Sequence, residues 1–382
     1  MDGLLKKILY AYKKKLNLAS FIIALIPSLL IEHSIFAEAI QREYRSANFL
    51  GKGDTGIADA KGFDAIFYNP AGIAQGKGIL NEIIVASPQA EASTNIMELK
   101  NSVTGQSGSS VLQVLSQNQN KSYSAVIQNY SGVIFRKVAI GAFARGSANY
   151  YNYTDLSIPS GFSQVDTNVR YGAHLTLAQP LLNDRIFIGL NGKYLQKDQI
   201  KFKIDSSSPD YSGSNNILDS LKSTNQRKGA GIGADIGMMF LLEKNTGTQL
   251  GIAYRNIGMT YRWVADSNKG APAAEPTTLD VGFVSSIGTT RNKISLSVDV
   301  VDVLNTQKQI FLKRSHIGLE YSLLDMFGVQ TGINQGYWVY GGYLGTKVIR
   351  VEGGVFTEEM GNKYKENPNQ SAFVRLVVGW LN

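Results

Sequence analysis

The sequence contains three histidines, His33, His174 and His316, the side chains best suited to acid and base chemistry near neutral pH. His33 falls in an apolar N-terminal stretch, and neither of the others stands in a nucleophile-elbow or paired-metal-ligand context. His316 and Glu320 share one face of a predicted strand, but four strand residues span about 13 Å, too far for direct proton transfer. The histidines therefore predict no active site.

Two other patterns resemble sites of known chemistry. Asp299 and Asp302 lie on either side of a break in alternation, which suits a pair of catalytic carboxylates or, more commonly, a β-bulge with solvated acids. The stretch GAGIGADIG, residues 229–237, imitates a dinucleotide fingerprint, yet its glycines alternate along a predicted strand and no helix follows. We therefore expect no enzymatic activity, no cofactor and no bound metal.

Charged residues recur on one face of the predicted strands, opposite an apolar face. This polar face carries Arg145, Lys193, Asp235, Arg255, Asp280, Asp299, Glu320, Arg350, Glu352 and Arg375. If the polar face lines a lumen, these groups either form ion pairs that hold its contents to the wall or border a polar passage.

The positions of these charges depend on a long series of predicted strands. From Ile79 onward, apolar residues alternate with small or polar ones and turn residues interrupt the pattern. Such alternation is typical of a lipid-facing β-barrel and also of a soluble β-sandwich, whose apolar face is buried. The predicted strands are residues 79–89, 123–135, 138–148, 163–178, 185–204, 228–242, 248–263, 277–288, 293–303, 309–322, 327–334, 337–344, 347–357 and 370–382.

The connections favour the barrel. Short joins such as Arg136-Lys137 alternate with shorter external joins near Asn305 and Gln335 and with longer ones at 90–122, 149–162, 205–227, 264–276 and 358–369. Outer-membrane barrels have short periplasmic turns and longer external loops. The sequence therefore predicts an all-β fold, an antiparallel up-and-down transmembrane barrel of about fourteen strands over residues 79–382.

The N-terminus predicts export. Five lysines precede an apolar run from Leu18 to Ile31, and Ala37-Glu38-Ala39 has the small-x-small pattern of a cleavage site. The run of roughly fourteen residues is shorter than the ~20 of a spanning helix. The net charge of +8 is scattered, which indicates no nucleic-acid partner. We expect a cleaved signal peptide at residues 1–39 and a multi-pass protein in the outer membrane of a Gram-negative-type bacterium.

The stretch DAIFYNPAGIA, residues 64–74, leads into a rigid Asn-Pro-Ala-Gly knuckle. With the glycine-led segment before it, this stretch resembles the start of FadL-type outer-membrane transporters of hydrophobic compounds and of the related PorV-type barrels. Later stretches such as TLDVGF, LSVDVVDV and GVQTGINQGYWVYGGYLG resemble the PorV type more closely. Together they cover most of the mature chain. The resemblance implies a barrel with an N-terminal plug inside its lumen.

We assign residues 40–78 to this plug. A barrel of about fourteen strands encloses a lumen too wide for its own side chains to fill, so a separate segment must fill it. The residues expected to shape and gate the plug are Phe63, Phe67, Tyr68, Asn69, Pro70, Ala71 and Gly72.

Two predicted external loops carry short helical patterns, SSVLQVLSQ and NNILDSLKS. Amphipathic helices beside a barrel mouth would offer a landing site for a hydrophobic small molecule, or would simply cap the mouth. The landing residues would be Val111, Leu112, Leu115, Ile217, Leu218 and Leu221.

Two functions stay open. The first is passive transport of a hydrophobic small molecule, fatty-acid-like or aromatic, into the periplasm. The second, implied by the PorV resemblance, is a binding and assembly module for exported proteins. Other expected partners are outer-membrane lipid and the barrel-insertion machinery, which recognises a last strand with an aromatic residue near its end, here Trp380.

Overall fold

The computed structural model describes residues 40, 42–104, 121–155, 158–205, 224–264, 270–289, 291–361 and 363–381. Residues 1–39 and all the predicted landing residues lie outside these ranges, so the signal peptide and the landing site stay predictions. Within the described ranges, no helix is both long and apolar enough to cross a membrane.

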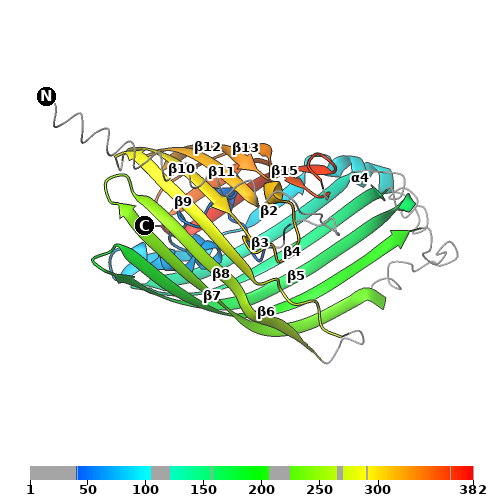
Figure 1. Ribbon diagram of the computed structural model, residues 1–382, viewed down its shortest axis with the longest axis horizontal. Coiled ribbons are helices and arrows are strands. Elements are labelled where there is room, and N and C mark those ends of the chain that lie inside the picture. The colour runs from blue at the N-terminus through cyan, green and yellow to red at the C-terminus, as the bar shows by residue number, and fades with distance from the viewer. Residues whose placement is uncertain are drawn as a thin grey trace.

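The strands form one closed antiparallel sheet (Figure 1). β1 (Leu80–Ala86) and β2 (Gln89–Ser93) both lie between β15 and β3, so they are two halves of one wall strand. The wall therefore has 14 strands, which confirms the predicted barrel. The other strands are β3 (Ser122–Phe135), β4 (Val138–Asp155), β5 (Ile158–Leu181), β6 (Ile186–Asp205), β7 (Gln226–Glu243), β8 (Thr248–Trp263), β9 (Thr278–Gly288), β10 (Asn292–Val300), β11 (Ser315–Leu323), β12 (Phe327–Asn334), β13 (Tyr337–Gly345), β14 (Ile349–Glu359) and β15 (Pro368–Trp380).

Side chains alternate between lipid and lumen along each strand, as β6 illustrates. Leu190 and Tyr194 point outward and are 49% and 44% exposed, whereas Asn191 and Lys193 point inward and are buried. Beyond Tyr194 the next two outward residues, Gln196 and Asp198, are polar, and the Gln196 amide donates to the Tyr194 hydroxyl over 2.8 Å. The continuous apolar face of β6 is therefore interrupted after Tyr194, and the strand continues to Asp205.

The first wall strand is interrupted at Ser87 and Pro88, because proline has no N–H for the ladder. Side chains replace the missing ladder bonds. The Ser87 hydroxyl donates to the Tyr130 carbonyl and accepts from the Tyr130 N–H, and the Ser131 hydroxyl donates to the Val85 carbonyl. The wall stays closed across this break.

The long strands on one side differ from the prediction (Figure 1). β4 continues to Asp155 and pairs there with Ile158 of β5, so most of the loop predicted at 149–162 is strand. The prediction is wrong because strands beyond the lipid band need no apolar face. The strand predicted at 309–322 is also wrong at its start, where η3 (Phe311–Arg314) precedes β11. The join after β10 is therefore longer than predicted.

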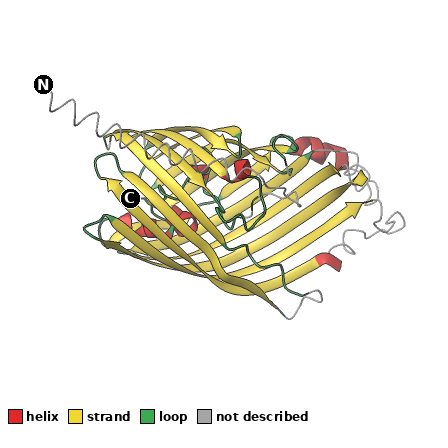
Figure 2. Ribbon diagram, in the orientation of Figure 1, coloured by secondary structure: helices red, strands yellow, loops and turns green. Residues whose placement is uncertain are grey.

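The N-terminal segment folds inside the barrel, where Figure 2 shows its short helices within the strands. These are α2 (Ala47–Leu50), α3 (Asp64–Tyr68) and η2 (Pro70–Gln75), whereas α4 (Ile96–Val103) follows β2 at the long-loop end. The plug and inward wall residues share one buried hydrophobic core. The chain leaves the lumen at the short-turn end, where Arg136 N–H donates to the Ile79 carbonyl.

Candidate functional site

The knuckle joins α3 to η2. Asn69 is extended, with φ −156° and ψ 105°, the region that a following proline favours. Its Oδ1 accepts from the Ala71 N–H over 3.2 Å and so caps η2. Its side-chain amide donates to three carbonyl oxygens, those of Ile57, Met238 and Ile252, at 2.8, 3.1 and 3.3 Å. One buried side chain thus ties two parts of the plug to β7 and β8.

Wall glycines let the plug backbone approach closely. A Cβ on Gly189 would overlap the backbone of Pro70, and a Cβ on Gly237 would overlap the Asn69 side chain. Other wall glycines meet the plug in the same way, and the set that approaches the plug segment from Gly51 to Ala71 on this side comprises Gly189, Gly237, Gly251, Gly282, Gly318, Gly332 and Gly341. These belong to β6, β7, β8, β9, β11, β12 and β13, so the plug is sealed against much of the circumference.

Aromatic rings fill the remaining side of the lumen. The Phe67 ring stacks on Tyr44 at 4.2 Å between centroids and meets Tyr130 and Phe143 edge-on at 5.3 and 5.7 Å. Phe63 also packs on Tyr130, at 4.9 Å. We call these five residues the aromatic seam, because plug rings and wall rings from β3 and β4 meet along it.

Tyr68 and Gly72 hold the plug together internally. The Tyr68 hydroxyl donates to Asp54 over 2.5 Å and accepts from the Ser46 N–H over 3.2 Å. A Cβ on Gly72 would overlap the Ala60 carbonyl, so this position accepts no side chain without movement. The plug is therefore a compact unit with its own internal contacts.

Buried ion pairs connect the plug to the wall in several directions. The wall-facing pairs are Glu43 with Lys193 at 2.7 Å, Arg45 with Glu91 at 3.0 Å and with Glu358, Lys52 with Glu320 at 3.0 Å, and Asp64 with Arg375 at 3.1 Å. They agree with the interpretation that luminal charges form ion pairs that hold the plug to the wall. Buried pairs add little net stability, but removing one partner leaves an uncompensated buried charge. The pairs therefore specify the position of the plug.

Lys52 binds two carboxylates at once, Asp59 at 2.5 Å and Glu320 at 3.0 Å. Burial disfavours the charged form of Asp59, but attraction to Lys52 and Lys61 prevails and lowers the pKa of Asp59 to about 2. This contact consequently stays ionised through the physiological pH range.

Both carboxylates that flank the break in alternation are buried, so the predicted bulge with solvated acids is wrong. Asp299 Oδ2 accepts from the N–H groups of Gly56 and Ile57 at 2.7 and 2.9 Å. Asp302 follows the end of β10 and accepts from the Thr306 N–H over 2.9 Å. Asp299 therefore anchors the plug, and Asp302 shapes a turn.

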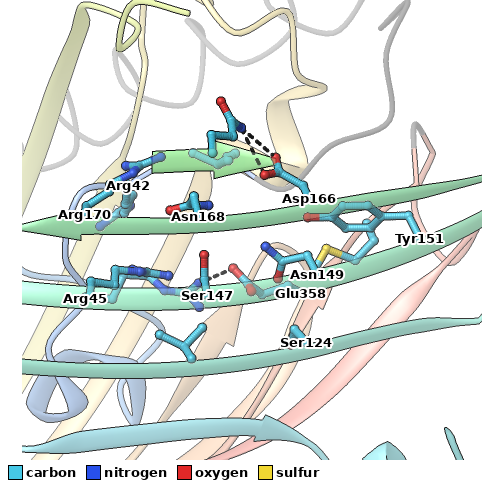
Figure 3. A pocket seen from close by; sticks show the side chains of 15 residues that line it. Arg42, Arg45, Ser124, Ser147, Asn149, Tyr151, Asp166, Asn168, Arg170 and Glu358 are labelled. Carbon is cyan, nitrogen blue, oxygen red and sulfur yellow. Dashed lines mark hydrogen bonds and ion pairs between the residues drawn. The ribbon is translucent and has the colours of Figure 1, made fainter. Parts of the chain in front are cut away.

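A small polar cavity of about 70 Å³ lies on the long-loop side of the plug (Figure 3). Its charged lining comprises Arg42, Arg45, Arg145, Asp166, Arg170 and Glu358. Arg45 is paired with Glu358, and Arg170 lies 3.4 Å from Glu275. Among the described residues, Arg145 Nη1 has no hydrogen-bond partner. This cavity suits water or small polar groups, not an apolar ligand.

The join before β9 turns into the lumen. Glu275 accepts from Lys197 over 3.1 Å and from the Tyr261 hydroxyl over 2.8 Å, in addition to its contact with Arg170. Sequence reasoning missed this inward turn. The signal that could have indicated it is an acid flanked by Pro272 and Pro276, because prolines keep such a segment extended.

The structure brings the predicted plug residues together. Phe63, Phe67, Tyr68, Asn69, Pro70, Ala71 and Gly72 are all buried in the lumen. The predicted inward-facing charges also line the interior or contact the plug. Sequence reasoning missed the plug's own ionic residues, Arg42, Glu43, Arg45 and Lys52, because it weighed only the glycines, the aromatic residues and the Asn-Pro-Ala-Gly knuckle there. The gating role of these residues stays a prediction.

No protein-family model and no curated protein matches the sequence. The structure is similar to that of the Ralstonia pickettii toluene transporter TbuX, with a TM-score of 0.52 and 13% identity over 87% of this chain and 97% of that one. The Pseudomonas putida toluene transporter TodX gives 0.50 and 11% over 89% and 98%. Identity this low shows the fold alone. The chain has the fold of a FadL-type outer-membrane transporter.

Proposed function

We propose that the protein is an outer-membrane channel that admits a small hydrophobic compound passively, with the N-terminal plug as its gate. One observation carries the proposal: the lumen is filled by a separate segment that is held there by side-chain and backbone contacts and continues into the wall only at β1. The similarity in fold to two toluene transporters supports the class of solute.

The aromatic seam is the proposed route past the plug. Most inward wall residues are charged or polar. Transfer of a hydrophobic solute from lipid or detergent to such a surface releases no free energy. Along the seam, however, Phe63 and Phe67 face Tyr130 and Phe143. A solute that enters here would replace the contacts between these rings by its own contacts with them. Opening the seam also requires Glu43 to separate from Lys193, which lies beside it on β6.

Entry would begin at the predicted landing residues of the external loops, where burial of apolar solute surface supplies roughly 25 cal/mol per Å². Movement of the knuckle would then release the solute toward the periplasm. Transport by this route uses no energy source, so the concentration gradient of the solute alone drives net uptake.

Uptake of labelled toluene by intact cells tests the proposal. Leu115→Asp with Leu221→Asp should weaken uptake without preventing folding, and Pro70→Ala should change its rate. Phe67→Ala tests the seam directly, and an uncoupler should leave uptake by the wild type unaltered. Equal uptake by the wild type, by the double aspartate variant and by cells lacking the protein would contradict a transport role.

A second candidate function is a binding and assembly module for exported proteins. The specific observation in its favour is that the plug is anchored to the wall by ion pairs on opposite sides, while the cavity beside it is small and polar. Unchanged hydrophobic uptake in the loop variants, together with a defined exported protein that binds the external loops, would favour this function.

Both candidates place the chain in the outer membrane after removal of residues 1–39. Amino-terminal sequencing of the protein purified from outer-membrane fractions tests both points, with Ile40 as the expected first residue.

A further inference from the structure

Exposed cations crowd the short-turn end of the barrel. They include Lys77, Arg136, Arg185, Lys244, Arg291 and Lys347, against the exposed acids Asp184, Glu243 and Asp325. Within the described part of the chain, none of these cations forms an ion pair with a protein carboxylate. Clusters of Lys and Arg at a membrane surface attract anionic lipid headgroups.

We call these exposed cations the basic ring. An apolar groove of about 640 Å³ crosses the outer face of the barrel wall next to part of this ring. Its floor follows the register of β4 to β7, in which Val138 pairs with Leu177, Leu177 with Leu190, and Leu190 with Ile236. Leu177, Leu190 and Ile236 are each nearly half exposed on the outward face. The groove therefore opens toward the bilayer, not toward the lumen.

The groove lies directly above two of the basic turns. Val138 follows Arg136 and Lys137 in the chain, and Ile188 follows Arg185 by three residues, a distance of about 10 Å along a strand. Lys137 itself lines the groove, and its ammonium donates to the carbonyls of Ala74 and Gly76 at the end of the plug. The apolar lining of the groove thus ends at cationic groups at the membrane surface.

We propose that this groove binds one anionic phospholipid, with an acyl chain along Leu177, Leu190 and Ile236 and the phosphate between Arg136 and Arg185. Only a molecule within the bilayer can reach the groove, which excludes a soluble partner. The positive charge at its lower end distinguishes an anionic headgroup from a zwitterionic one. The site rests on placement in an outer membrane and not on which solute is transported.

The experiment uses the full mature chain in nanodiscs of phosphatidylethanolamine with a minor fraction of phosphatidylglycerol. Lipid retained after mild detergent extraction is quantified by mass spectrometry. Two surface cations correspond to a roughly thirtyfold preference, so the wild type should enrich phosphatidylglycerol by about that factor. Arg136→Gln with Arg185→Gln should abolish the enrichment, and Ile188→Trp should reduce it by filling the groove.

The matched control is Arg291→Gln with Lys347→Gln, which removes the same charge from turns outside the groove. The control should keep the enrichment, and heat-modified migration in gels should show that every variant forms a barrel. An equal loss of phosphatidylglycerol enrichment in the control and in the Arg136/Arg185 variant would overturn the proposed site. It would mean that the whole ring attracts anionic lipid without a defined binding position. A wild type that does not discriminate between the two lipids would overturn it as well. Either result leaves toluene uptake, and hence the proposed transport function, a separate question.

Discussion

Asp64 of the plug and Arg375 of the last wall strand form a partly buried ion pair, with 3.1 Å between Oδ1 and Nη1. Arg375 also donates from Nε to Glu352 over 2.7 Å and from Nη1 to the Tyr44 hydroxyl over 3.2 Å. One guanidinium on β15 therefore joins the plug to β14 and to the aromatic seam. Since β15 closes the barrel against β1, the plug and the closure of the wall depend on a common residue.

Replacing Asp64 by Asn should loosen the plug without opening the wall, because Arg375 keeps its contact with Glu352. We expect a loss of about 1–3 kcal/mol in the free energy of unfolding, the usual effect of removing a charged hydrogen-bond partner. Urea unfolding in detergent measures it, and single-channel recording should show more frequent openings. Lys121→Gln is the control, since its pairing with Glu98 is exposed and should contribute almost nothing. Identical curves for the two variants would contradict a structural role for the Asp64 contact.

Two glycines on β6 face opposite sides of the wall, Gly189 toward the plug and Gly192 toward the lipid. Gly189→Ala should displace the knuckle, because its Cβ would overlap Pro70, and we expect a cost of about 1–3 kcal/mol and a leakier channel. Gly192→Ala adds the same methyl group three residues away, where the nearest atom is Leu175 O at 3.8 Å. Conductance in planar bilayers measures the difference. If Gly192→Ala leaks as much as Gly189→Ala, the close approach of plug and wall does not form the seal.

Deleting residues 40–70 should leave a foldable barrel. The wall's hydrogen bonds close on themselves, and water entering the empty lumen would solvate the charges that the plug now pairs. Conductance should rise and larger solutes should pass. The measurement combines planar-bilayer recording with liposome swelling in sugars of increasing size. A deleted form that neither conducts more nor admits larger sugars would show that the segment does not block the lumen.

The short turns should face the periplasm and residues 215–223 the outside. An epitope inserted at each of residues 136–137 and 215–223, probed with antibody on intact and permeabilised cells, measures the orientation. Labelling at 215–223 on intact cells is the expected result. Labelling at 136–137 without permeabilisation would reverse the orientation, and with it the leaflet assigned to the phospholipid groove.

Local pattern was enough to predict the barrel, because the two-residue period of a strand is visible in any short window. The outward Leu190 and the inward Lys193 are each assigned correctly from their immediate neighbours. The knuckle could be recognised for a similar reason, since Pro70 restricts the conformation of Asn69 whatever surrounds it. Outside the lipid band this reasoning failed, as at Asp155 and Ile158, because no apolar face is needed there.

Contacts between distant segments required the tertiary structure. Nothing near Glu43 in the sequence indicates that it meets Lys193 and His174, and nothing near Asp299 indicates that it receives the N–H groups of Gly56 and Ile57. A sequence shows which groups carry charge. Which of them are paired is decided only when the closed sheet sets the shape of the lumen and excludes the water that would otherwise solvate each group separately.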